Sequence, residues 1–163
     1  MGDSFEETLI AALPRLKRYA LSLCRRGDVA DDLVQVTVER AIAARDRYDP
    51  ATRLDPWLFR ILRNAWIDTT RRTATRGTEI DVSSMPEAAV VDGERINEAV
   101  LMLRKTEDAL ATLGEDQRAV VLLVCFEELS YAEAAEVLGI PRGTVMSRLA
   151  RARIALAEKL GLE

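Results

Sequence analysis

Hydroxyl and guanidinium side chains recur near the end of the chain at a spacing that suits contact with DNA. Thr144, Ser147, Arg148 and Arg151 would all lie on one face of an α-helix. Hydroxyls and guanidiniums are groups that base edges and phosphates in a DNA major groove accept. An ordinary helical hairpin with a solvated basic face would carry the same residues. The segment by itself therefore favours DNA binding and leaves the hairpin open.

Signals on either side of this face predict two helices joined by a tight turn. Ser130 and Glu133 have the spacing of a capping box, which satisfies free backbone N–H groups at a helix start. Gly139 can adopt the left-handed conformation that ends the first helix, and Pro141 can open the second. The second helix has an apolar stripe that we expect to be buried: Val145, Leu149, Ala152, Leu156 and Leu160.

A second cluster lies on a helix that we expect to start with Asp55 as its N-cap and Pro56 as its first residue. The polar members that share one face, or lie beside it, are Arg60, Asn64, Asp68, Arg71, Arg63 and Arg72. The aromatic residues that accompany this face are Trp57, Phe59 and Trp66. Such a surface is suited to binding single-stranded nucleic acid, since bases stack on aromatic rings while arginines bind phosphates. Tryptophans in a small helical bundle are usually core residues, so that alternative stays open.

Composition excludes several classes of protein. The 163 residues include 48% apolar residues and five prolines, which indicates a folded globular chain. We find no apolar run near the roughly 20 residues of a membrane span, and no apolar centre of a signal peptide. Cys24 and Cys125 stand apart and histidine is absent, so we expect a cytoplasmic protein without disulfides or zinc, and buried cysteines. Without a glycine-rich phosphate loop or metal-ligand cluster, we expect no cofactor, no metal and no enzymatic activity.

The net charge of −4 is unevenly distributed along the chain. Residues 1–76 contain 14 basic and 11 acidic side chains, while residues 141–159 contain five basic side chains and one acidic. Local potential governs contact with phosphates, and overall charge limits indiscriminate binding. We therefore expect the free chain to bind DNA weakly and to need help from a partner.

The pattern of apolar residues predicts helices throughout, in two blocks. The first block has a helix with the stripe Leu9, Leu13, Leu16, Ala20 and Leu23 that ends near Gly27, and helices at 28–45 and 55–72. Glycine, serine, proline and acids in residues 76–94 indicate a linker. The second block has helices near 95–112, 115–128, 130–138 and 141–160. We therefore expect an all-α fold with two small domains, residues 1–75 and 95–163.

Three segments in order carry a family resemblance: DDLVQVTVERAIAARDRYDP, WLFRILRNAWIDTTRR and LSYAEAAEVLGIPRGTVMSRLARAR. They resemble the successive motifs of bacterial extracytoplasmic-function (ECF) sigma factors, and LPRLKRYALSL resembles the first helix of their promoter-melting domain. The sequences of these segments are similar to those of alphaproteobacterial members of the family. The resemblance implies an accessory subunit of RNA polymerase with two helical domains, a three-to-four-helix bundle and a four-helix domain with a helix-turn-helix. The first would open the −10 promoter element, and the second would bind the −35 element as duplex.

The resemblance also implies roles for particular residues. The positions that would face the polymerase clamp helices are Asp31, Asp32, Leu33 and Gln35. Asn64 would help to hold a base flipped out of the stack, because an amide can donate and accept at a Watson–Crick edge. The residues that would bind the single-stranded −10 element with it are Trp57, Arg60, Arg63, Asp68, Arg71 and Arg72. The positions that match the −35 recognition helix are Arg142, Thr144, Ser147, Arg148 and Arg151.

The implied partners are core RNA polymerase, through its clamp helices and flap, promoter DNA and an anti-sigma factor, with the free chain a monomer. One departure is Leu54, in a neighbourhood where the family often has an aromatic residue. Two other functions compete with a sigma factor. A stand-alone helix-turn-helix regulator would favour a dimer on two half-sites. A sigma mimic would bind an anti-sigma partner and never touch DNA, although it would not need the arginines and Asn64.

Overall fold

The computed structural model describes residues 4–76 and 98–162, and in these two ranges every regular element is helical. The chain divides into two compact units, Met1–Glu87 and Ala88–Glu163. The all-α, two-domain fold class predicted from the sequence is therefore confirmed. The predicted linker, residues 76–94, lies outside the described residues except for Arg76, which ends a helix. No helix in the described ranges combines the length and apolar composition needed to cross a bilayer.

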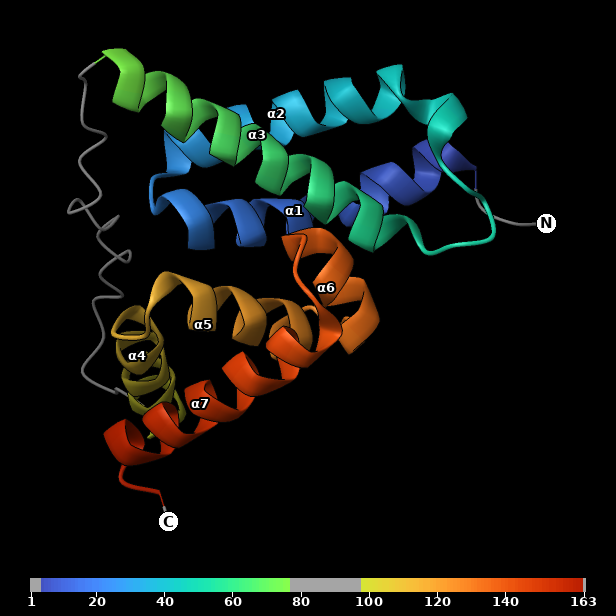
Figure 1. Ribbon diagram of the computed structural model, residues 1–163. Helices are drawn as coiled ribbons and strands as arrows, with labels where there is room; N and C mark the ends of the chain where they lie inside the picture. The colour runs from blue at the N-terminus through green and yellow to red at the C-terminus, as the bar shows by residue number, and fades with distance from the viewer. Residues whose placement is uncertain (1–3, 77–97, 163) are drawn as a thin grey trace. The chain divides into compact units, whose positions relative to one another are not determined.

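In its described residues, 4–76, the first unit contains three long helices, α1 (Phe5–Cys24), α2 (Gly27–Ala43) and α3 (Leu54–Arg76), with a 3-10 turn at Arg45–Arg47 (Figure 1). Ion pairs near both ends of their interface show that α1 and α2 run antiparallel. Near one end Lys17 Nζ lies 3.2 Å from Asp31 Oδ1, and near the other Arg45 pairs with Glu6. The third helix packs on both of the others, with Phe59 edge-on to Tyr19 of α1 at 5.2 Å between ring centroids.

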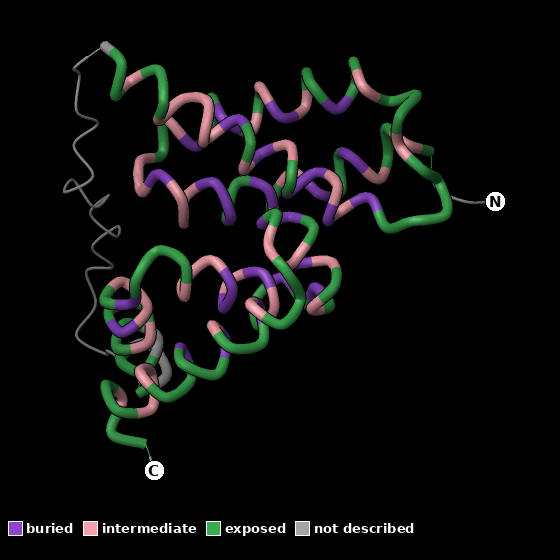
Figure 2. The backbone as a smooth tube through the Cα atoms, viewed as in Figure 1, coloured by how far each residue is buried: buried purple, intermediate pink, exposed green. Residues whose placement is uncertain are grey.

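Buried residues recur along one side of each helix in this unit (Figure 2). Leu9, Leu16 and Ala20 of the predicted α1 stripe are buried, whereas Leu13 and Leu23 are half-buried. The helix also ends earlier than predicted, because Arg25 adopts a left-handed conformation (φ 58°) that closes α1. Gly27, the predicted stop, opens α2 instead.

The helix α3 starts slightly earlier in the chain than predicted. The helix begins at Leu54, so Asp55 lies in its first turn and is not the residue before it. The carboxylate of Asp55 pairs with Arg15 of α1 and lies 3.6 Å from Arg53 Nη2. A carboxylate in a first turn still suits the helix dipole, and here it also joins α3 to α1.

The second unit contains α4 (Glu98–Ala111), α5 (Glu115–Val121), α6 (Tyr131–Leu138) and α7 (Arg142–Leu160) (Figure 1). The predicted helix at 115–128 widens after Val121 into a π-helical turn, Leu122–Phe126. This wider turn changes which way the following side chains face. Cys125 lies within this turn and is exposed, so the prediction that both cysteines are buried is wrong for Cys125 and confirmed for Cys24.

The turn between α6 and α7 is the one predicted from the sequence. Ser130 Oγ accepts from the Glu133 backbone at 3.0 Å, and Glu133 Oε1 accepts from the Ser130 backbone at 2.9 Å. Gly139 closes α6 with φ 65°, and Pro141 is the residue that precedes α7. Of the predicted α7 stripe, Val145, Leu149 and Ala152 are buried, while Leu156 and Leu160 are half-buried.

Replacing Arg25 with glycine should stabilise the first unit. An L-residue in the left-handed region is strained by its Cβ, and glycine removes that strain at a small cost in unfolded-state entropy. We expect a gain of about 0.5–1 kcal/mol in the free energy of unfolding, measured by urea titration of the full chain. Arg26→Gly is the matched control, because Arg26 has extended backbone and pairs with Asp28 at 2.9 Å. An equal loss in the free energy of unfolding in both variants would contradict the proposed strain at Arg25.

Candidate nucleic-acid interfaces

The outward side of α7 has small residues along its centre. Gly143, Ser147 and Ala150 are exposed and follow one another at helical spacing. They lie opposite the stripe that Val145, Leu149 and Ala152 bury, because each residue advances about 100° around a helix. These small side chains allow the first part of the α7 backbone to approach another surface closely, whereas Ile154, which is exposed, continues the same line further along the helix.

Longer side chains border this central line on both sides. One flank has Thr144, Arg148 and Arg151, and the other has Arg142, Met146 and Arg153. Four of the five predicted −35 residues therefore lie together, on the centre and first flank, while Arg142 lies on the opposite flank. The sequence-based prediction does not include Met146, Ala150 or Arg153, although the same helical spacing places them at this surface.

Two of the predicted residues already have contacts within the unit. Ser147 Oγ donates to the Thr144 carbonyl at 3.1 Å. Arg148 Nη2 lies 3.8 Å from Asp116 Oδ2, which is on α5. At this separation the two groups form an ion pair but no hydrogen bond, and both side chains are partly exposed to solvent. Asp116 therefore competes with a phosphate for the charge of Arg148.

On α3, the predicted polar face is divided between the surface and an interhelical contact. Arg60, Asn64 and Arg71 are exposed along one line of the helix, and Arg72 is exposed beside them. Asp68, predicted on the same face, lies with Oδ2 3.1 Å from Arg40 Nη1 of α2. Asp68 therefore helps to hold α2 against α3, and the pairing offsets its charge beside the arginines.

The aromatic residues of α3 are packed to different degrees. Phe59 is 1% exposed against Tyr19, so the prediction that it accompanies the basic face is wrong. Trp66 is half-buried, and so is Arg63. Burial raises the pKa of Tyr19 above its ordinary value, with Arg63 acting in the opposite direction. The Tyr19 hydroxyl has no hydrogen-bond partner among the described residues, and its ring carries the contact with Phe59.

Trp57 belongs to an aromatic cluster at the start of α3. Its ring centroid lies 6.2 Å from that of Phe5 and 5.2 Å from that of Tyr48, which follows the 3-10 turn. The Arg45 guanidinium lies over the Phe5 ring at 5.1 Å. Trp57, predicted to contact single-stranded DNA, is therefore half-buried by two other rings.

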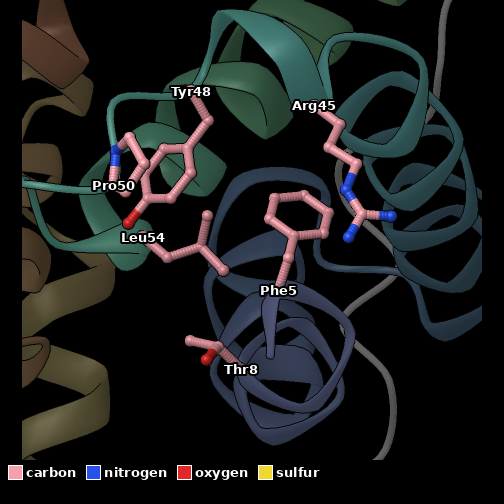
Figure 3. A pocket seen from close by; sticks show the side chains of 6 residues that line it. All are labelled: Phe5, Thr8, Arg45, Tyr48, Pro50 and Leu54. Atoms are coloured by element: carbon pink, nitrogen blue, oxygen red, sulfur yellow. The ribbon is translucent and has the colours of Figure 1, made fainter. Parts of the chain in front are cut away.

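A cavity of about 280 Å³ opens beside this cluster (Figure 3). The residues that line it are Phe5, Thr8, Arg45, Tyr48, Pro50 and Leu54. Flat apolar walls can hold a planar ring by stacking, whereas the charge of Arg45 at one side is already paired with Glu6. Sequence analysis missed this pocket because its walls come from α1, the loop and α3, whose proximity no local pattern records.

The residues predicted to contact polymerase include one that is buried and three that are exposed. Leu33 is 3% exposed, so it belongs to the core of the first unit and does not face a partner. Asp31, Asp32 and Gln35 are exposed at the start of α2, and Asp31 is paired with Lys17 of α1. Ile10 of α1 and Ile42 of α2 are also exposed. We call the surface formed by Ile10, Asp31, Asp32, Gln35 and Ile42 the α1–α2 surface.

Comparison with known proteins identifies the family. The family model of sigma-70 region 2 matches residues 9–76, and that of sigma-70 region 4 matches residues 103–156. The ECF RNA polymerase sigma factor EcfG of Rhodopseudomonas palustris (strain TIE-1) is 37% identical over 160 residues, covering 98% of this chain and 87% of that protein. The ECF RNA polymerase sigma factor SigC of Mycobacterium tuberculosis (strain CDC 1551 / Oshkosh) is 39% identical over 155 residues, covering 95% and 82%.

A solved structure agrees with these relatives. The sigma factor RpoE, in its co-crystal structure with the anti-sigma factor NepR from Bartonella quintana, matches with a TM-score of 0.77 and 33% identity over 98% of each chain. This chain therefore belongs to the ECF RNA polymerase sigma factors of the sigma-70 family, which are transcription regulators and not enzymes. The alphaproteobacterial type expected from the sequence is confirmed by the matches to EcfG and RpoE.

Replacing Asp116 with asparagine should strengthen binding to duplex DNA. The change removes a carboxylate from the side of α7 and releases Arg148 from its pair. We expect a gain of roughly two- to fivefold, since exposed pairs are worth at most about 1 kcal/mol. Fluorescence anisotropy at fixed salt with a labelled promoter duplex would measure it. Glu115→Gln is the control, because it removes the same charge one residue away; an equal gain there would mean that Arg148 is not involved.

Proposed function

We propose that this chain binds core RNA polymerase and directs initiation at specific promoters, with α7 reading the −35 element as duplex and α3 helping to open the −10 element. The observation that carries this proposal is the presence of two exposed basic helix faces, one in each compact unit. They differ in form: α7 has small residues along its centre and longer side chains on both flanks, whereas the exposed face of α3 has arginines on either side of an amide. These forms suit a duplex and a separated strand respectively.

The shape of α7 supports duplex recognition. A B-DNA major groove is about 12 Å wide and admits a helix whose leading side is narrow. Gly143, Ser147 and Ala150 supply that narrow side. Arginines on both flanks, Arg142 and Arg153 on one and Arg148 and Arg151 on the other, can reach base edges in the groove and the two phosphate backbones that border it.

The exposed face of α3 supports contact with single strands. Arg60 and Arg71 lie about three helical turns apart with Asn64 between them, so the guanidiniums can hold phosphates that are several nucleotides apart while the amide meets a base edge. The pocket beside Phe5 and Tyr48 offers rings near the start of the same helix. An exposed amide contributes little to folding, which leaves Asn64 available for such a contact.

The α1–α2 surface supports docking on core polymerase. Exposed Ile10 and Ile42 provide apolar area, while Asp32 and Gln35 provide acidic and amide groups. A basic amphipathic partner would match this combination, which fits the proposed contact with the clamp helices. Because RpoE was crystallised with an anti-sigma factor, we also propose control of this chain by an inhibitor of that class.

Run-off transcription with purified core polymerase and a promoter library tests the proposal as a whole. Specific initiation that depends on this chain is expected. A chain that binds an anti-sigma factor tightly yet never supports initiation would instead be a sigma mimic. Initiation without any dependence on −35 sequence would contradict the role of α7.

Replacing Arg148 and Arg151 together with alanine should weaken −35 recognition. The helix should persist, because alanine is a strong helix former and neither residue belongs to the buried stripe. A residue that reads a base loses about 1–3 kcal/mol when truncated, so transcription at limiting protein should fall at least tenfold. Lys159→Ala, an exposed basic residue at the end of α7, is the control and should retain activity. Wild-type output from the double variant on a −35-dependent promoter would show that the recognition face lies elsewhere.

Replacing Asn64 with alanine should impair promoter opening while polymerase binding is retained. Asn64 is exposed, and its proposed contact forms only after a base has left the stack. Permanganate footprinting should show weaker thymine reactivity near the start site, and a template with a pre-melted bubble should restore most activity. Thr75→Ala, further along α3 and also exposed, is the control. Equal defects on duplex and pre-melted templates would assign Asn64 a structural role.

A further inference from the structure

Met146 presents an apolar side chain on the proposed DNA-facing side of α7. It is 50% exposed, while its neighbour Val145 is fully buried. Among the described residues of α7, Ile154 is the other large apolar side chain with such exposure, and it lies about two turns further along. The first turns of a recognition helix are those that reach base edges. Met146 is therefore the exposed large apolar group in the part of α7 that would enter the groove.

The neighbours of Met146 indicate what it would meet. On its flank lie Arg142, one turn before, and Arg153, two turns after. The central residues beside it, Gly143, Ser147 and Ala150, are too small to shield it from an approaching surface. Met146 is thus flanked by arginines one and two helical turns away, and the small residues beside it leave its side chain open to a ligand. A suitable ligand would have an apolar group bordered by phosphates.

The floor of the DNA major groove offers one apolar group, the C5-methyl of thymine. We propose that Met146 reads a thymine methyl in the −35 element, which makes it a specificity-determining residue. A thioether chain is flexible and polarizable, so it can close on a methyl without a demanding geometry. The inference rests on the proposed function, because it takes the −35 duplex as the ligand of α7. Burial of one methyl group corresponds to about three- to fivefold in affinity.

Deoxyuridine substitution provides a direct test, since it removes the C5-methyl of thymine and nothing else. A −35 sequence would first be selected from a randomised duplex library with the full chain in complex with core polymerase. Each thymine of the selected element, on either strand, would then be replaced singly by deoxyuridine, and binding measured by competition. With the wild-type chain, one position should lose about three- to fivefold. With Met146→Ala or Met146→Gln, the same replacement should cost less than 1.5-fold.

The control is Ile154→Ala, which removes an exposed apolar side chain from the same helix and should leave the deoxyuridine effect intact. Three results would overturn the inference: no deoxyuridine-sensitive position, an unchanged effect in Met146→Ala, or an equal loss of the effect in Ile154→Ala. If Met146→Ala weakened binding to core polymerase with the deoxyuridine effect unchanged, Met146 would be a protein contact and the inference would fail. A library that yields no preferred duplex would overturn the proposed function and, with it, this inference.

Discussion

Burial of one stripe of α7 determines what the rest of that helix can present. Val145, Leu149 and Ala152 are closed off from solvent. Because successive residues are separated by a constant rotation, this packing also sets which side chains face outward and in what order. The capping box of α6 and the left-handed Gly139 set the turn before α7. The proposed contacts with DNA therefore depend on an apolar contact that never meets DNA.

Acidic side chains beside the basic residues have a common effect. Asp55 pairs with Arg15, Asp68 with Arg40, and Asp116 with Arg148. Asp55 and Asp68 join helices of the first unit, whereas Asp116 pairs with a proposed DNA contact. Each pair lowers the positive potential that a free phosphate would encounter. This arrangement is consistent with the expectation that the free chain binds DNA weakly and gains affinity through a partner.

The features predicted correctly from the sequence are those set by near neighbours in the chain. Ser130, Glu133 and Gly139 act within one or two helical turns, so their spacing was sufficient. The features missed depend on packing between distant segments. The burial of Phe59 against Tyr19 and the burial of Leu33 are examples. Helical periodicity identifies an apolar residue, but it does not say which of several apolar faces the partner helix covers.

The narrow centre of α7 has an implication for how promoter preference can diverge among chains of this architecture. In the proposed complex with the −35 duplex, enlarging Gly143, Ser147 or Ala150 would hold the helix away from the groove and weaken every contact at once. The flanking positions are not limited in side-chain size in this way, because they are at least partly exposed and contribute little to the core. If Met146 reads a thymine methyl as proposed, exchanging it for another residue would alter which base is favoured while the fold is retained. Preference for a new promoter can thus evolve by single replacements on the flanks, without an intermediate that fails to fold.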